Sequence, residues 1–387
     1  MPTLNLPVAG GKLAPYTMRP PHTWPKAATP FNRVAYAAAH VVADPLAEVD
    51  PTLAAAVDWE ATIAFRRHLW SLGLGVAEAM DTAQRGTGMD YPASLELIRM
   101  SLAAARDFPG ATIVCGAGTD HLSPRERTTV NDVIAAYEQQ CAEVEKLGGR
   151  IVLMASRALV KAARSPDDYA KVYGRVLAQV REPVIIHWLG EMFDPALAGY
   201  WGASDHDKAM AVAVDVIAAN PEKVDGVKIS LLDKDKEIAM RRRLSQGVRM
   251  YTGDDFNYAE LIAGDALGYS DALLGIFDAI APAAAAALGA LARNDTGTFH
   301  EVLAPTVPLS RHIFKAPTRF YKTGVVFMAY LNGLQDHFTL VGGQESARST
   351  LHLAELFRLA DAAGLLADAD VAASRMRAVM ATRGVDA

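Results

Sequence analysis

The chain has 387 residues, of which 51% are hydrophobic and 21% are charged. This composition is typical of a well-packed globular protein with one large domain or two ordinary ones. The formal net charge of −6 offers no basic surface for a phosphate backbone, which argues against a nucleic-acid partner. Two cysteines, Cys115 and Cys141, are too few for a disulfide framework, so a reducing, cytoplasmic location is predicted.

Residues 1–30 have no charged start followed by an apolar core, so no signal peptide is predicted there. Prolines at positions 7, 15, 20, 21 and 25 predict an extended arm instead. The longest apolar run, residues 279–292, contains Pro282 and is shorter than the roughly 18 to 20 residues of a membrane-spanning helix. No membrane partner is therefore expected.

Short β-rich runs alternate with longer segments of helical periodicity, which is the pattern of βα units around a parallel sheet. The segments between the runs include residues 130–149 and 165–180, whose apolar residues recur at helical spacing. Eight runs are predicted to be strands: 33–40, 72–80, 111–118, 150–156, 183–189, 224–230, 247–253 and 270–277. Eight units of this total length match a (β/α)8 TIM barrel, which typically has about 250 residues.

After residue 280 the sequence predicts helices alone, and no low-complexity linker divides the chain. We therefore expect an α/β protein with three parts. These are an N-terminal extended arm over residues 1–30, a (β/α)8 TIM barrel catalytic domain over residues 31–290, and a C-terminal helical extension over residues 291–387.

In a TIM barrel the active site forms at the carboxyl ends of the strands, so polar residues there are the candidates. Each also has an ordinary explanation, because Asp and Ser at the start of a loop often cap a helix; this applies most to Asp81, Asp120 and Asp255. The candidates in chain order are His40, Glu78, Asp81, Asp120, His121, Ser156, Arg157, His187, Glu191, Lys228, Ser230, Asp254 and Asp255.

Lys228 stands inside an apolar run that otherwise predicts a buried strand. Side chains alternate along a strand, so Val227 and Ile229 share one face and Lys228 lies on the other. If the apolar face packs beneath the helices, Lys228 points into the barrel, where desolvation lowers its pKa and frees its amine to attack a carbonyl. The alternative is a lysine that extends to the rim and pairs with Glu78 or Asp254.

His187 has the parity of Ile185 and is expected to face the barrel interior. Its near-neutral pKa suits proton transfer, although a hydrogen-bonded core histidine fits the pattern equally well.

Two further segments have ordinary explanations. The charged run 233–243 is predicted to be the solvated face of a helix, and the glycines of 342–349 to form a turn between helices rather than a phosphate site.

In order and spacing, these segments resemble the dihydrodipicolinate synthase and N-acetylneuraminate lyase family of class I aldolases, from about residue 31 onward. "EPVIIHWLG" resembles the family's fifth-strand segment, and "VDGVKIS" resembles the sixth-strand segment with its Schiff-base lysine. "VRMYTGDD", which contains Gly253, resembles the seventh-strand segment that ends in Ser/Thr-Gly-Asp-Asp. The resemblance implies a dihydrodipicolinate-synthase-like branch of the superfamily, a TIM barrel, an imine at Lys228, no cofactor and a homo-oligomer.

Three differences from the family's pattern bear on the substrate. The second-strand Gly-Thr-Thr-Gly-Glu motif, which holds the carboxylate of a 2-oxo acid, is replaced by "AEAMDTAQ", where Glu78 and Asp81 would repel that group. His187 stands where the family has a proton-relaying tyrosine. Ser156 and Arg157 replace an aromatic pair, and Arg157 is suited to an anionic substrate group. A hydroxylated, sugar-derived carbonyl compound is therefore expected in place of pyruvate.

The predicted function is a Schiff-base-forming carbon–carbon lyase or aldolase, or a related dehydratase, in which Lys228 forms the imine and His187 moves protons. Substrate contacts are predicted from Glu78, Asp81, Asp120, His121, Arg157, Glu191, Ser230, Gly253, Asp254 and Asp255. Two alternatives stay open. The barrel could bind sugars without catalysis, or a divalent ion could polarise a ketone on ligands drawn from Glu78, Asp120, His187, Glu191 and Asp254.

Overall fold

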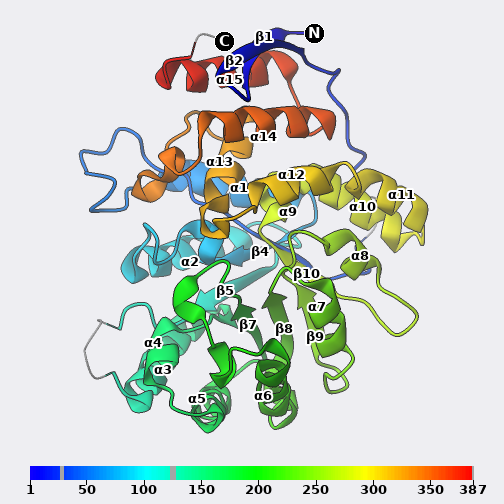
Figure 1. Cartoon of the computed structure of the whole chain (residues 1–387). Helices are drawn as coiled ribbons and strands as arrows, with labels where there is room; N and C mark the ends of the chain where they lie inside the picture. Colours follow the sequence, from blue (N-terminus) through cyan, green and yellow to red (C-terminus); the bar gives the residue numbers. More distant parts are fainter. Residues whose placement is uncertain (27–29, 123–127, 386–387) are drawn as a thin grey trace.

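A closed barrel of eight parallel strands forms the centre of the computed structural model, which describes residues 1–26, 30–122 and 128–385 (Figure 1). Around the barrel, each strand pairs with its neighbours in the chain, and β10 closes on β3. The strands are β3 (Ala35–Ala38), β4 (Gly75–Glu78), β5 (Ile113–Ala117), β6 (Arg150–Leu153), β7 (Val184–Leu189), β8 (Val224–Ser230), β9 (Arg249–Thr252) and β10 (Asp271–Leu274). The predicted (β/α)8 TIM barrel is confirmed, and each observed strand lies within a predicted run.

Helices between the strands begin where local capping signals stop the preceding loop. The helix α3 (Val130–Lys146) starts at a capping box in which Thr129 and Asp132 bond to each other's backbone, and α5 (Pro166–Gln179) has proline in its first turn. The other helices of this part are α1 (Trp59–Ser71), α2 (Tyr91–Arg106), α4 (Arg157–Ala162), α6 (His206–Ala218), α7 (Lys234–Arg241), α8 (Tyr258–Ala263), α9 (Ile276–Ala279) and α10 (Ala281–Ala292). Short 3-10 turns are η1 (Asp81–Ala83), η2 (Pro195–Leu197), η3 (Tyr200–Gly202) and η4 (Pro221–Lys223).

The strand side chains divide into an inner and an outer set, as the alternation of a strand requires. Val227 and Ile229 of β8 belong to the large core that the strands share with the surrounding helices. The barrel interior is filled by a separate cluster: Tyr36, Ala38, Ala77, Met80, Val114, Val152, Ile185, Tyr251 and Leu273. Lys228 and His187, with the parities of the inner set, therefore face the interior as predicted.

A layer of helices lies along one side of the barrel, next to α1 and α10 (Figure 1). In Figure 1, α13 lies nearer the barrel, and α14 and α15 are stacked beyond it. The layer comprises α11 (Thr296–Leu303), α12 (Thr306–Ile313), α13 (Tyr321–Leu331), α14 (Thr350–Ala362) and α15 (Ala369–Thr382), with η5 (Thr318–Phe320) and η6 (Val341–Ser346) between them. Among the described residues, no helix is long and apolar enough to cross a membrane.

The N-terminal residues form a hairpin where the sequence predicted an extended arm. Strands β1 (Thr3–Val8) and β2 (Lys12–Thr17) pair antiparallel, and β1 packs against α14 and α15 (Figure 1). The prolines at positions 7 and 15 misled the prediction, because both strands of a two-stranded hairpin are edges and tolerate proline. Leu4 and Leu6 are buried beneath the hairpin, so the first segment of the chain covers the last.

Candidate active site

Lys228 points into the barrel near the carboxyl end of β8. It lies between His187 of β7 and Tyr251 of β9 in the strand pairing, and only 7% of the residue is exposed. Burial lowers the pKa of its amine, while the negative charges of Asp255 and Asp81 act in the opposite direction. The lysine is thus enclosed within the barrel. Its neighbouring carboxylates are Asp255 and Asp81, and not Glu78 or Asp254, the partners expected if the lysine extended to the rim.

Gly253 at the end of β9 gives the Lys228 side chain its space. A Cβ atom at Gly253 would lie 2.8 Å from Lys228 Cε and 2.6 Å from the carbonyl oxygen of Ile229, distances that no ordinary side chain tolerates. Gly253 was predicted to contact the substrate. The structure adds a second reason for glycine at this position, because the absence of a side chain lets the lysine pass along the barrel wall.

His187 is completely buried beside Lys228. Its Nε2 lies 3.3 Å from Ser230 Oγ, and its Nδ1 has no hydrogen-bond partner among the described residues. Burial, and to a lesser extent the charge of Lys228, hold the pKa of the imidazole well below its usual value. The ring is therefore neutral at neutral pH and has a nitrogen able to exchange a proton with a ligand.

Asp255 is the acidic partner of Lys228 at this side of the barrel. Its Oδ1 accepts a hydrogen bond of 2.9 Å from the backbone N–H of Ile276, the first residue of α9. Burial raises the pKa of Asp255 to about 7, even though Lys228 acts to lower it. A carboxyl group with this pKa exchanges its proton near neutral pH, which is the property expected of a group that takes part in proton transfer.

Two residues that the sequence did not indicate reach the same region from α13. The hydroxyl of Tyr321 lies 2.9 Å from Thr82 Oγ1, and burial, followed by the charge of Asp81, raises its pKa, so the phenol keeps its proton. Lys322 is only 4% exposed, and its Nζ donates to the carbonyl oxygen of Arg319 at 3.2 Å. Burial lowers the pKa of this second lysine too. In the sequence, Lys322 stands next to the apolar residues of α13, and this position could have indicated a buried lysine.

A cavity of about 320 Å³ lies across the carboxyl ends of β4 to β7. It brings together four of the predicted site residues, Asp81, Asp120, Arg157 and His187. Arg157 donates through Nε to Asp194, and its side chain remains half exposed to this space. Cationic groups and hydrogen-bonding groups share the wall, which also includes Arg85, Thr119, Lys161 and Asp194.

Glu78 lies outside the barrel interior, contrary to the prediction. Its Oε1 and Oε2 accept hydrogen bonds of 2.8 and 2.9 Å from Arg66 of α1, and Ser101 of α2 donates to Oε2 at 2.5 Å. Both members of this ion pair are fully buried. The physical reason is alternation, because Ala77 faces the interior and the next side chain must face the helices. Glu78 therefore holds α1 and α2 against β4 and is not a substrate ligand.

Asp120 is held by a guanidinium. Arg85 donates to its two carboxylate oxygens at 3.0 and 2.8 Å, and Gln140 adds a bond of 3.0 Å. Burial alone would raise the pKa of Asp120, but Arg85 and Gln140 outweigh it and the pKa is lowered. His121 bonds to Gln139 and Gln140 and lines a different, more open groove, so it does not join the barrel mouth as predicted.

Two further predicted contacts have structural partners instead. Glu191 forms an ion pair of 3.3 Å with His206 and is exposed at the rim. Asp254 accepts hydrogen bonds from the backbone N–H groups of Phe256 and Asn257 and so fixes the loop that leads into α8. Neither residue lines the cavity at the mouth. Lys228 and Asp255 do not line it either, so the roles predicted for Glu191 and Asp254 as substrate contacts stay predictions.

The same partners separate the ligands that the metal hypothesis requires. Glu78 is bound to Arg66, Asp120 to Arg85 and Glu191 to His206, each at a different place in the fold. Across residues 1–26, 30–122 and 128–385, no three His, Cys, Asp or Glu side chains are placed to hold one ion. The proposed set does not form a coordination sphere.

The barrel is similar to solved structures of dihydrodipicolinate synthase relatives. A putative dihydrodipicolinate synthetase from Pseudomonas aeruginosa is 15% identical with a TM-score of 0.64, over 86% of this chain and 99% of that one. Dihydrodipicolinate synthase from Aquifex aeolicus is 13% identical with a TM-score of 0.65 and the same coverage of both chains. At these identities the likeness establishes the fold.

A third solved structure is a prophage protein of the dihydrodipicolinic acid synthase family from E. coli K12, in complex with pyruvate. It is 11% identical with a TM-score of 0.63, over 92% of this chain and 99% of that one. No curated protein matches the sequence significantly. The family model described as "Protein of unknown function (DUF993)" matches residues 4–385, and the chain therefore belongs to that family.

Proposed function

We propose that the protein is a class I aldolase-type enzyme, a carbon–carbon lyase or aldolase or a related dehydratase, that forms a Schiff base through Lys228. The observation that carries this proposal is an amine buried inside the barrel with a lowered pKa, next to a neutral histidine. A neutral amine is a nucleophile, whereas an ammonium group is not. The fold likeness to dihydrodipicolinate synthase relatives agrees with this chemistry without establishing it.

The chemical steps use Lys228, His187 and Asp255, of which His187 lines the cavity at the carboxyl ends of the strands. Lys228 Nζ adds to the substrate carbonyl carbon, and loss of water gives an iminium ion. A base, His187 or Asp255, removes the proton of the substrate's β-hydroxyl group, the bond between the α and β carbons breaks, and its electron pair passes to the iminium nitrogen. The released fragment is an aldehyde and the retained one an enamine, which is protonated and then hydrolysed by water to free the lysine.

The substrate in this proposal is a small hydroxylated carbonyl compound of the kind derived from sugars. Asp81 lines the cavity and offers oxygen atoms that accept hydrogen bonds from hydroxyl groups. Arg157 and Lys161, on the other side of the cavity, suit a terminal anionic group. With Glu78 bound to Arg66, the argument against pyruvate depends on Asp81 alone, so a 2-oxo acid belongs in the test.

The experiment is borohydride trapping with a panel of small hydroxylated ketones, aldehydes and 2-oxo acids, followed by peptide mass spectrometry. We expect a reduced adduct on Lys228 with one substrate class, and loss of turnover by at least about 10³-fold in Lys228→Met. Lys322→Met is the matched control, because Lys322 is also a buried lysine whose pKa burial lowers. It should retain adduct formation at Lys228.

Two results would contradict the proposal. An adduct on Lys322 with Lys228 unmodified would show that Lys322, and not Lys228, forms the Schiff base. Ligand-induced stabilisation without turnover of any compound would favour a binding barrel that has no catalytic activity.

The predicted cytoplasmic location and homo-oligomer remain part of the proposal. Sedimentation of the purified chain measures its oligomeric state.

A further inference from the structure

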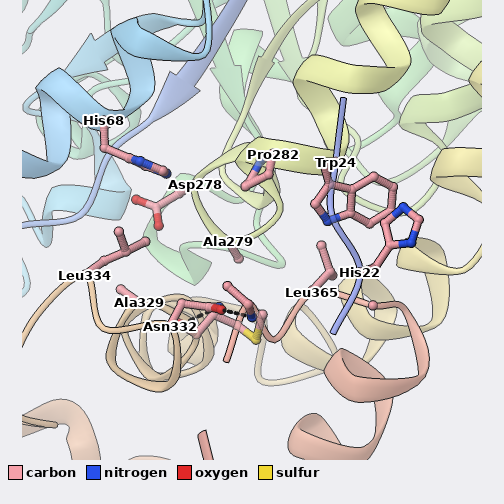
Figure 2. Close-up of a pocket in the computed structure, with 13 residues that line it drawn as sticks. His22, Trp24, His68, Asp278, Ala279, Pro282, Ala329, Asn332, Leu334 and Leu365 are labelled. Atoms are coloured by element: carbon pink, nitrogen blue, oxygen red, sulfur yellow. Dashed lines mark hydrogen bonds between the residues drawn. The ribbon is translucent and has the colours of Figure 1, made fainter. Parts of the chain in front are cut away.

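A second cavity lies outside the barrel, beneath the segment that follows the N-terminal hairpin (Figure 2). It has a volume of about 100 Å³. Its walls come from α1, α9, α10 and α13, from the turn after α14, and from His22 and Trp24. None of the catalytic groups described above lines it.

Asp278 of α9 carries an oxygen with no protein partner. Its Oδ2 accepts hydrogen bonds of 2.8 Å from the backbone N–H and from Nδ1 of His40. Its Oδ1 is buried and has no hydrogen-bond partner among the described residues. The side chain is 0% exposed, and Figure 2 shows it pointing into the cavity. A buried carboxylate oxygen without a donor is costly, so this site favours a ligand that supplies one.

The other polar groups of the cavity do not balance the charge of Asp278. Burial lowers the pKa of His68, so its imidazole stays neutral, and its Nε2 also lacks a partner among the described residues. Asn332 is already bonded to the carbonyl oxygen of Met328 and to the backbone N–H of Ala367. No lysine or arginine occurs among the described residues that line this space. The cavity is therefore electronegative at one end.

The remaining wall is apolar and partly aromatic. Trp24 offers its indole ring, whose face attracts cations, and Met328 and Leu365 enclose the side nearer α13 and α14. The space is many times larger than the roughly 10 to 15 Å³ that one water molecule needs, so a small organic molecule fits. One charged end and an apolar, aromatic body define the complementary ligand.

We propose that this cavity binds a small organic cation, a primary ammonium group on a short apolar chain. The ammonium group donates hydrogen bonds to Asp278 Oδ1 and to the lone pair of His68 Nε2, and the chain lies against Trp24 and Leu365. This assignment is independent of the reaction at Lys228, because Lys228, His187 and Asp255 do not line this cavity. The site is new with respect to the aldolase-type function proposed above.

The test is calorimetric titration of the purified chain with n-butylammonium chloride and, in parallel, with 1-butanol, which has a similar shape and no charge. We expect saturable binding of the ammonium ion, at least about tenfold tighter than that of the alcohol. Asp278→Asn should remove this preference. Asp361→Asn is the matched control, since Asp361 is an equally buried carboxylate that bonds to Tyr16 and lies outside the cavity; it should bind the ammonium ion as the wild type does.

A second variant keeps the test valid if Asp278→Asn does not fold. Ala329→Leu fills the cavity from α13 and leaves Asp278 and His40 in place, so it should weaken ammonium binding by about tenfold or more while the protein still unfolds cooperatively. Equal affinity for n-butylammonium and 1-butanol would overturn the proposal. So would absence of binding, or binding that is unchanged in the filled variant.

Discussion

The charged side chains on the two sides of the barrel have different kinds of partner. At the ends of β4 and β5, Glu78 accepts two hydrogen bonds from the guanidinium of Arg66, and Asp120 accepts two from that of Arg85. At the ends of β8 and β9, the charges have no such partner. Asp255 is bonded to a backbone N–H, and the Lys228 amine is near carboxylates without forming an ion pair within 4 Å among the described residues.

In the proposed function, this difference separates the groups that hold the scaffold together from the groups that take part in the reaction. A carboxylate in a bidentate pair with arginine stays ionised and stationary, which fixes the elements around it. Buried groups without a fixed counterion have pKa values shifted toward the neutral form: burial raises the pKa of Asp255 to about 7 and lowers the pKa of Lys228. By this criterion the β8 and β9 side is the one that suits the proposed chemistry.

The largest expected effect is on stability, at Glu78. Glu78→Gln leaves the guanidinium of Arg66 buried without its counterion, which should lower the free energy of unfolding by about 3 to 5 kcal/mol. Urea denaturation measures the change. Arg157→Gln breaks an ion pair whose arginine is half exposed and should cost less than about 1 kcal/mol. A Glu78 variant of wild-type stability with impaired substrate binding would reinstate Glu78 as a ligand.

The succession of eight β-rich runs and helical segments predicted the barrel. The two-residue period of a strand predicted the inward direction of Lys228 and His187, because this period is a local property of any strand. The same rule, applied to β4, would have placed Glu78 outward once Ala77 was assigned to the interior. Tyr321 was beyond prediction for a different reason. It reaches the mouth from a helix far along the chain, and only the packing of α13 against α9 brings it there.

The next effect is on the rate, at Asp255. Its pKa of about 7 predicts that kcat/KM rises as the pH passes through this value, because the ionised carboxylate is the form that accepts a proton. Asp255→Asn should lower kcat/KM by about 10²-fold and remove that rise. Asp254→Asn is the neighbouring control. It disturbs the loop before α8 but should keep the rise, since Asp254 bonds to backbone N–H groups there. Retention of the rise in Asp255→Asn would refute the assignment.

The smallest expected effect is a pH dependence of stability, at Glu237 of α7. This side chain is buried behind β9, where hydroxyl groups of Thr252 and Ser270 donate to it at 2.9 and 2.7 Å and no arginine or lysine forms an ion pair with it among the described residues. Burial raises its pKa from 4.5 to about 8. The charged run 233–243 was predicted to be a solvated helix face, and Glu237 is its buried exception.

The sign of the effect follows from proton counts. Between these two pKa values the unfolded chain has lost the Glu237 proton and the folded chain has kept it, so stability is fully present at low pH and falls as the pH rises through about 8. From about pH 6 to about pH 8 this group should remove about 2 kcal/mol of unfolding free energy. Glu237→Gln should flatten that decline in urea denaturation, and Glu260→Gln, an exposed carboxylate paired with Lys234, should not. If the unfolding free energy of Glu237→Gln changed with pH as it does in the wild type, the buried carboxyl group would be ionised in the folded protein. Carboxylates without a guanidinium partner would then stay ionised here, as those with such a partner do.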